Sequence, residues 1–277
     1  MKYYLVPLLL VLFVSACGDD TENDKAEKID PSEEVVVTFA DQKLENLVRD
    51  ELERPSGDIT SLDMQELYFL TINEAGVTNL TGLEYALELR EFTLMRETVD
   101  SLEPLQNLSN LERFIVRYSE IKDLPIKFSE SVDLKHISTT GTVIEDISFV
   151  EHMTNLEHVT MSDAKITDIA VLEQAVNIKQ LNFRGNQISN IDALAEMNQL
   201  EVLNLQGNEI ACIEALTELE SLNDVVLSYN PIANIRPLET LPALQTVVVY
   251  LPHETKHLIF EQVATLRDMG IDVSYHR

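Results

Sequence analysis

The sequence predicts an α/β repeat solenoid that curves into a horseshoe, and three observations support this. Apolar positions recur at a period of 22 residues, with one step of 23. One part of each repeat alternates with a period of two, as a short strand does, and the other spaces its apolar residues by three, as 3₁₀ turns do. Stacked strands would form a parallel sheet on the concave face, with 3₁₀ turns on the convex side. The best-preserved repeat contains Leu200, Leu203, Leu205, Ile210, Ile213, Leu216 and Leu219.

The first residues have the features of a secretory signal. Lys2 precedes an apolar run from Tyr4 to Val14, which is shorter than the roughly 20 residues that a bilayer-spanning helix needs. The residues Val14-Ser15-Ala16-Cys17 resemble a bacterial lipobox, which implies cleavage before Cys17 and diacylation of its sulfur. We therefore expect a lipoprotein signal peptide at residues 1–16 and a lipid anchor on the extracytoplasmic face of the cell membrane.

Two segments are expected between the anchor and the repeats. Residues 17–34 are acidic and nearly devoid of apolar side chains, so they should form a lipidated, disordered tether. Residues 35–66 should form a cap with one helix that begins after Asp41 and ends before Pro55. Its apolar face contains Leu44, Leu47, Val48 and Leu52. A solenoid leaves an apolar end open, so a cap is expected there on physical grounds.

Residues 67–251 contain eight full repeats and one further strand. Their pattern, LxxLxLxxNxIxxIxxLxxL with a 22-residue period, resembles the leucine-rich repeats of the internalins and related Gram-positive surface proteins. The resemblance implies a leucine-rich-repeat horseshoe that binds a protein through its concave face. Such repeats mostly bind proteins, each a different one, so the partner's identity is not implied.

The turn asparagine of the motif is absent from the earlier repeats. It is present as Asn186, Asn208 and Asn230, whereas the equivalent positions hold Ala75, Glu97, Ser119, Thr142 and Ala164. Buried backbone groups in those repeats are therefore expected to need other partners. The repeat at 111–133 also has one extra residue near Pro125 to Phe128, either a local bulge on the convex side or a functional protrusion.

Residues 252–277 are expected to form the second cap, a helix followed by a strand. Leu258, Ile259, Val263 and Leu266 lie on one helical face, Gly270 ends the helix, and Ile271 to Tyr275 follow.

Charge and cysteine content exclude some classes of partner and of stabilising bond. The formal net charge is -28, which disfavours nucleic acid and anionic lipid surfaces as direct partners. The only cysteine besides Cys17 is Cys212, so no intramolecular disulfide is expected. Cys212 occupies a repeat position that holds Asn or Asp elsewhere, and we interpret it as a small filler without a catalytic role.

Strand alternation defines columns of side chains that face outward from the concave sheet. In these columns four arginines accompany four acids, so the inner face should be near neutral while the remaining surface is acidic. Arginine beside exposed aromatic and aliphatic groups is typical of binding hot spots. One predicted cluster comprises Met95, Arg96, Arg113, Ile115, Arg117 and Tyr118; a second comprises Val226, Tyr229, Val248 and Tyr250.

His136 and His158 occupy the same position in adjacent repeats. A metal site is not predicted, because Arg113 repels cations and no third ligand is evident. They are either surface histidines or a pH-sensitive contact. No catalytic motif or cofactor site is recognisable, so we expect no enzyme.

We expect a membrane-anchored module that binds a protein. The alternative is a structural or glycan-binding component of the cell envelope, since Tyr229 and Tyr250 could stack on sugars. Asn182, Asn204 and Gln206 could supply hydrogen bonds to them.

Overall fold

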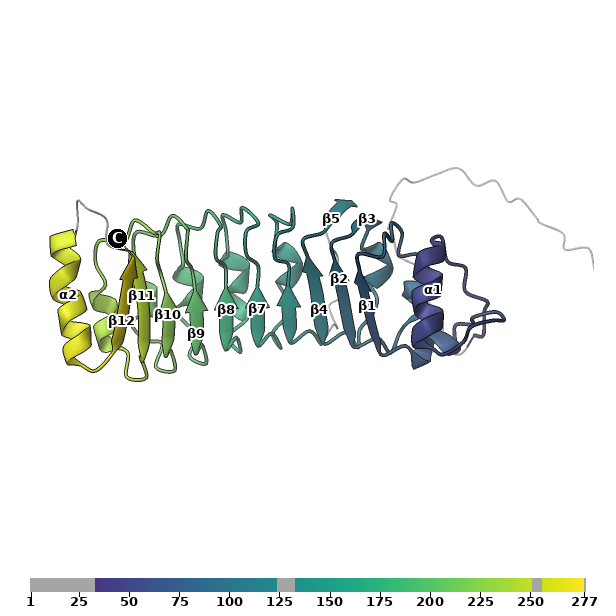
Figure 1. Cartoon of the computed structure of the whole chain (residues 1–277). Coiled ribbons are helices and arrows are strands. Elements are labelled where there is room, and N and C mark those ends of the chain that lie inside the picture. Colours follow the sequence, from purple (N-terminus) through teal and green to yellow (C-terminus); the bar gives the residue numbers. More distant parts are fainter. Residues whose placement is uncertain (1–32, 124–132, 251–255, 277) are drawn as a thin grey trace, which may run out of the picture.

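A computed structural model describes residues 33–123, 133–250 and 256–276. These residues form an elongated stack with a helix at each end (Figure 1). The predicted signal peptide, Cys17, most of the tether and the extra residue near Pro125 lie outside the described residues. Among the described residues, no helix has the length and apolar character needed to cross a bilayer.

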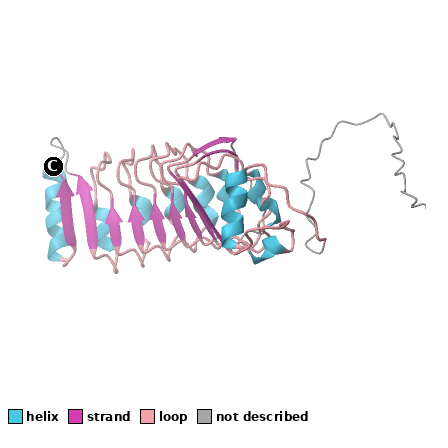
Figure 2. Cartoon of the chain, turned by 45° about the vertical axis from the view of Figure 1, so that its right-hand side comes forward, coloured by secondary structure: helices cyan, strands magenta, loops and turns pink. Residues whose placement is uncertain are grey.

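A ten-stranded parallel sheet forms one side of the stack, as the repeat pattern predicts (Figure 2). Each strand is offset from the next by about one repeat, and every neighbouring pair is parallel. In spatial order the strands are β1 Phe69–Asn73, β2 Glu91–Met95, β4 Arg113–Arg117, β6 His136–Ser138, β7 His158–Thr160, β8 Gln180–Asn182, β9 Val202–Asn204, β10 Asp224–Val226, β11 Thr246–Tyr250 and β12 Asp272–His276.

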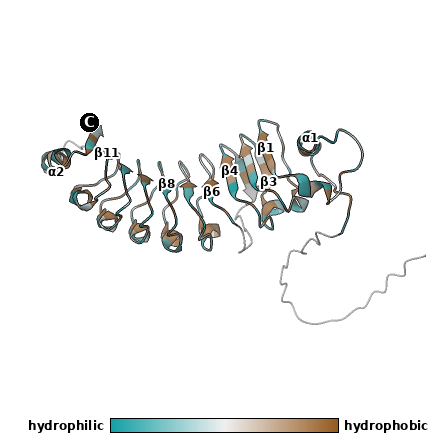
Figure 3. Cartoon of the chain, turned by 90° about the horizontal axis from the view of Figure 1, so that it is seen from below, coloured by the Kyte–Doolittle hydropathy of each residue, from teal (hydrophilic) through white to brown (hydrophobic). Residues whose placement is uncertain are grey.

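Short 3₁₀ helices form the opposite side, also as predicted. The strands lie on the inner side of a shallow arc and the 3₁₀ helices on its outer side (Figure 3). The helices are Asp63–Glu66, Leu83–Tyr85, Glu103–Leu105, Ser148–Val150, Ala170–Gln174, Asp192–Leu194, Glu214–Leu216 and Arg236–Thr240. Pro104 and Pro237 are the second residues of two of them, where no sheet hydrogen bond is lost.

The core is a continuous apolar layer between the sheet and the 3₁₀ helices. The inward positions of the strands and turns, such as Leu203, Leu205 and Leu216, are fully buried. Phe92 and Phe114 stack on adjacent strands with ring centroids 6.2 Å apart. Because each repeat buries its apolar residues only against its neighbours, both ends of this layer must be covered.

The N-terminal cover is α1, Gln42–Glu51, as the sequence predicts. Leu44 and Val48 are fully buried. Asp41 caps the helix by accepting a hydrogen bond from the Lys43 backbone N–H at 2.8 Å, and its second oxygen accepts from the Thr78 N–H at 2.8 Å. Burial alone raises the pKa of Asp41, but these backbone donors outweigh it and hold the pKa below its usual value. Asp41 thus joins the cap to the first repeat.

The C-terminal cover comprises α2, Lys256–Asp268, and β12. Ile259, Val263 and Leu266 of α2 are buried, and Gly270 ends the segment with a φ of 89°. The sequence predicts a helix and a strand here, but not that β12 continues the main sheet. It pairs in parallel with β11, so the cap supplies the tenth strand.

An asparagine ladder braces the later repeats. Asn186 Oδ1 accepts from the backbone N–H groups of Ala164 and Ile166 at 3.2 and 3.0 Å, and its Nδ2 donates to two backbone carbonyls. Asn208 and Asn230 likewise bind the preceding turn: each Oδ1 accepts from one backbone N–H, that of Ile188 or Ile210, and each Nδ2 donates to two backbone carbonyls. These residues satisfy buried backbone groups that would otherwise be unpaired.

The earlier repeats use different partners for the same groups. The Glu97 carboxylate, only 3% exposed, accepts from the Ala75 N–H, and Ser119 Oγ accepts from the Glu97 N–H at 3.2 Å. Beside them, β3 Thr98–Ser101 and β5 Glu120–Asp123 form a two-stranded parallel sheet that the sequence analysis did not predict. Its ladder supplies hydrogen bonds where the asparagine is missing.

The interpretation of Cys212 as a filler is wrong, because its side chain is exposed. At this repeat position Asp146, Asp168 and Asn190 each accept a hydrogen bond from the backbone N–H two residues later, at 2.7–2.8 Å. The position therefore caps the following 3₁₀ helix, and a thiol is a weak acceptor for that purpose.

Candidate binding surface

The strand register brings the predicted cluster together on the concave face. Met95 and Arg117 are Cα partners, and Ile115 lies between Thr93 and Ser138. Arg113 lies between Glu91 and His136. Arg113, Ile115, Arg117 and Met95 are all half-buried, so their outer atoms remain accessible. The predicted columns are therefore real neighbours in space.

The column that follows each strand has left-handed backbone. Its non-glycine members are Glu74, Arg96, Tyr118, Asp163 and Tyr229, with φ between 51° and 58°. Gly141, Gly185 and Gly207 occupy it in the other turns, with φ between 64° and 70°. A non-glycine residue in this region costs of order 1–3 kcal/mol, and such residues cluster at functional sites. Three members of the two predicted clusters, Arg96, Tyr118 and Tyr229, lie here.

Tyr118 is held against the next turn by a glycine. A Cβ atom added to Gly141 would lie 2.7 Å from Tyr118 Cδ1, so the ring occupies space that only glycine leaves open. Tyr118 is nevertheless 58% exposed. The ring is therefore positioned on one side and open to a partner on the other.

The concave arginines fall into two pairs that differ in their contacts. Arg96 lies 3.1 Å from the Glu74 carboxylate and Arg184 lies 3.7 Å from that of Asp163. Arg113 and Arg117 have no ion pair with any described residue; Arg117 Nε donates to Ser138 Oγ at 3.0 Å. The sequence placed Arg96 in the binding cluster, but Glu74 already offsets its charge. Arg113 and Arg117 are the cations available to a ligand.

The second predicted cluster contains a stacked pair. The rings of Tyr229 and Tyr250 are 5.2 Å apart with an interplanar angle of 23°, and Tyr229 is 52% exposed. Val226 and Val248 are Cα partners on β10 and β11, and each is half-buried. This pair forms a small aromatic and aliphatic surface near the C-terminal end of the sheet.

His136 and His158 stack face to face. Their ring centroids are 4.4 Å apart, the rings are within 4° of parallel, and both side chains are half-buried. Burial, His158 and Arg113 together lower the pKa of His136, and the carboxylates of Glu157 and Glu91 only partly oppose them. Imidazole lone pairs lie in the ring plane, so parallel stacked rings do not converge on one tetrahedral ion. In the described parts of the chain, no group of three metal-ligating side chains is suitably placed.

Two features of this side of the molecule lie outside the predicted clusters. Phe69 on β1 is 52% exposed and begins the column that contains Arg113 and His136. At the entry to the strands, the next column alternates in charge. Its hydrogen-bonded register runs Tyr68, Arg90, Glu112, Lys135, Glu157, Lys179 and Glu201. The 22-residue period applied to that column would have revealed the alternation.

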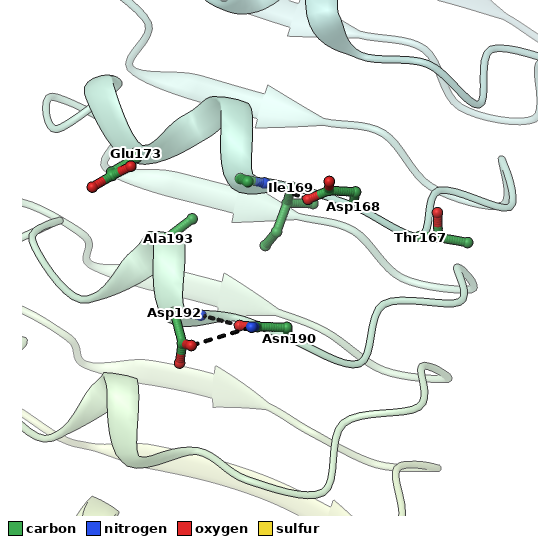
Figure 4. A pocket seen from close by; sticks show the side chains of 8 residues that line it. Thr167, Asp168, Ile169, Glu173, Asn190, Asp192 and Ala193 are labelled. Carbon is green, nitrogen blue, oxygen red and sulfur yellow. Dashed lines mark hydrogen bonds between the residues drawn. The ribbon is translucent and has the colours of Figure 1, made fainter.

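A shallow groove lies on the convex side, between two 3₁₀ helices (Figure 4). Its polar residues include Asp168, Asn190 and Asp192. Asp168 and Asn190 cap the helices that they precede, and Asn190 Nδ2 donates to Asp192 Oδ2 at 3.1 Å. The groove is therefore explained by turn structure and adds no binding site.

Comparisons with known proteins agree with this architecture. A family model for leucine-rich repeats, in two copies, matches residues 176–221. Internalin C2 from Listeria monocytogenes is 26% identical, with 76% of this chain and 94% of that chain covered and a TM-score of 0.66. The chain thus has the fold and repeats of an internalin-like leucine-rich-repeat protein. No curated protein matches the sequence.

Two more distant structures share the fold alone. The functional domain of InlJ from Listeria monocytogenes, described as including a cysteine ladder, is 20% identical with a TM-score of 0.52. That match covers 77% of this chain and 55% of the other. TLR13, solved as a complex with ssRNA13, is 16% identical with a TM-score of 0.56, over 69% of this chain and 30% of the other.

Proposed function

We propose that this protein is a lipid-anchored, extracytoplasmic module that binds another protein through its concave face. Repeat solenoids commonly bind partners on their extended concave surface. The observation that carries the proposal is the contiguous cluster Met95, Arg113, Ile115, Arg117 and Tyr118. Its arginines Arg113 and Arg117 have no ion pair with a carboxylate of the described residues, and they adjoin a positioned, exposed tyrosine. Desolvated arginine and tyrosine are the side chains most often responsible for binding energy.

The test of the concave surface is a pair of substitutions with a matched control. We expect Arg113→Ala and Tyr118→Ala each to weaken binding of a partner recovered from envelope extracts by roughly 2 kcal/mol, or about thirtyfold. Tyr85→Ala, on the 3₁₀-helical side, should leave affinity unchanged. Circular dichroism melts must first show that the two concave variants remain folded. Full binding by both would move the site elsewhere.

The proposed anchor has its own test. Residues Val14 to Cys17 support lipidation of Cys17, and two acyl chains would suffice for stable membrane attachment. Cys17→Ser should therefore move the protein from the membrane fraction to the soluble fraction, as measured by fractionation and immunoblotting. Cys212→Ser, the matched control, should remain in the membrane fraction. A membrane-bound Cys17→Ser variant would contradict the anchor.

A glycan-binding role is a second candidate, favoured by the stacked Tyr229–Tyr250 pair. Two of the polar groups suggested for sugar contact already accept hydrogen bonds: Asn182 Oδ1 from the Arg184 N–H, and Asn204 Oδ1 from the Gln206 N–H, at 3.2 and 3.1 Å. Their amide donors would remain for a sugar. Binding to purified wall polysaccharide that is lost in Tyr229→Ala, but retained in Tyr118→Ala, would favour this role over the first.

A further inference from the structure

The concave face contains a small cationic site in a strongly acidic protein. Arg113 and Arg117 have no ion pair with described residues, although the chain has 48 acidic residues against 20 Lys and Arg. Ser138 Oγ accepts from Arg117 Nε and thereby orients the guanidinium, leaving its terminal nitrogens for another acceptor. The planar guanidinium fork matches a carboxylate in two parallel hydrogen bonds.

The stacked histidines extend this site along the sheet. Arg113, His136 and His158 are successive Cα partners on β4, β6 and β7. With strands about 4.8 Å apart, they span roughly 10 Å. Protonating His136 alone would place a cation between Arg113 and the His158 ring. Repulsion between this cation and Arg113 disfavours protonation. An anion lying over these groups would offset the repulsion.

The charged groups facing the histidines limit what can bind. Glu91 on β2 lies on the far side of Arg113 in the same column, and Gln180 on β8 adjoins His158. Along the entry to the strands, Glu112 accepts from Lys135 and Glu157 accepts from Lys179, each at 2.8 Å. These acids border a cationic area only three strands wide. A short run of carboxylates fits it, whereas a polyanion much longer than this area would also meet the acidic surroundings.

We propose that Arg113, Arg117, His136 and His158 form a carboxylate-binding site that accepts an acidic segment of the protein partner and binds it more tightly as the pH falls. This inference rests on the proposed concave binding surface and specifies the chemistry of its partner. The two arginines supply affinity at neutral pH. His136, stacked on His158, adds cationic charge at lower pH when a carboxylate is present.

The direction of the pH dependence follows from proton linkage. In the free protein the pKa of His136 is below its usual value, chiefly because of burial and then of His158 and Arg113. A bound carboxylate favours the protonated ring and raises that pKa. Between the two pKa values the complex holds more protons than the free protein, so affinity increases as pH decreases through that interval. Glutamate side chains, with a pKa near 4.3, remain mostly ionised at pH 5.5.

A hexaglutamate peptide is a suitable probe, with hexaglutamine as its neutral counterpart. Binding is measured by NMR titration of the histidine ring resonances at pH 7.5 and 5.5, at constant ionic strength. We expect hexaglutamate to bind at least threefold more tightly at pH 5.5 and to raise the pKa measured for His136. Hexaglutamine should shift neither histidine.

Matched variants separate the two parts of the site. Arg113→Gln and Arg117→Gln should each weaken hexaglutamate binding at least fivefold at both pH values. The double variant His136→Gln/His158→Gln, followed by peptide-resonance shifts, should bind as well as the parent at pH 7.5 but without the gain at pH 5.5. Arg236→Gln and His152→Gln change exposed residues on the convex side and should alter neither affinity nor its pH dependence.

Several results would overturn this inference. They are absence of hexaglutamate binding, binding retained in both arginine variants, a pH gain that survives the double histidine variant, and equal affinity for polyphosphate of the same charge. The proposed function can survive the failure of this inference. If the recovered partner still requires Tyr118 while hexaglutamate does not bind, the concave surface stands and only the carboxylate site is lost.

Discussion

At the scale of single residues, position 212 shows how one side chain departs from its repeat. Asn79, Asp146, Asp168, Asn190 and Asn234 each accept from the backbone N–H two residues later, at 2.7–3.2 Å. Cys212 offers only sulfur to the equivalent N–H of Glu214. A weak acceptor leaves this turn less well capped than its neighbours.

We predict that Cys212→Asn increases the free energy of unfolding by about 0.5–1 kcal/mol, the usual contribution of such a cap. Urea denaturation followed by circular dichroism would measure it. Cys212→Ala adds no acceptor and should leave stability close to the parent, whereas Asn190→Ala should lose a similar amount. An equal effect of Asn and Ala at position 212 would contradict the capping role.

At the scale of elements, the charge-alternating column joins neighbouring strands outside the core. Lys135 Nζ lies 2.8 Å from Glu112 Oε2, and Lys179 Nζ lies 2.8 Å from Glu157 Oε2. The hydrogen bond from Lys135 lowers the pKa of Glu112, and that from Lys179 lowers the pKa of Glu157. The acid of the following repeat also attracts each lysine: Glu157 raises the pKa of Lys135, and Glu201 raises that of Lys179, in both cases less than the hydrogen-bonded acid does. Opposite charges on adjacent strands favour the observed register.

We predict that Lys135→Glu lowers the melting temperature more than Lys165→Glu does. Among the described residues Lys165 has an ion pair with one acid, Glu145 at 3.6 Å, whereas Lys135 lies between Glu112 and Glu157. At low ionic strength the decrease in melting temperature for Lys135→Glu should be roughly twice that for Lys165→Glu. The first variant creates two like-charge contacts, whereas the second creates one. The difference should shrink in 1 M NaCl, where the Debye length is about 3 Å. Equal shifts would mean that the column acts as isolated pairs.

At the scale of the whole molecule, excess negative charge opposes the compact state. The formal net charge is -28. Among the described residues, which form an elongated stack, the acids are not collected in a group that could hold a metal ion. Repulsion among exposed like charges is screened by salt, whereas burial of the continuous apolar core is not. The stack should therefore gain stability from moderate salt even though the ion pairs of its strand edges weaken.

We predict that raising NaCl from about 10 to 300 mM increases the melting temperature by about 2–4 °C, the shift that roughly 1 kcal/mol produces in a domain of this size. Calorimetry at constant pH would measure it. KCl at the same ionic strength is the control for specific sodium binding and should give the same increase. A melting temperature independent of salt would show that the strand-edge pairs already offset the repulsion.

The repeat period alone determined most of the architecture and much of the surface. Residues 22 apart become neighbours in a parallel sheet, so the columns containing Arg113, Met95 and Tyr229 could be assigned from the sequence. The caps, the 3₁₀ turns and the concave placement of the sheet also follow from burial of a repeating apolar pattern. Lipidation of Cys17 and the boundaries of the segments before the repeats stay predictions.

Only the tertiary structure decided which side chains on that surface are engaged. It paired Arg96 with Glu74, oriented Arg117 through Ser138, and stacked His136 on His158. It also placed β12 in the main sheet. Periodicity specifies which positions adjoin, because the backbone ladder repeats regularly. It does not specify which of several neighbouring partners a long side chain contacts, because that choice depends on local backbone conformation and on competition among groups within reach.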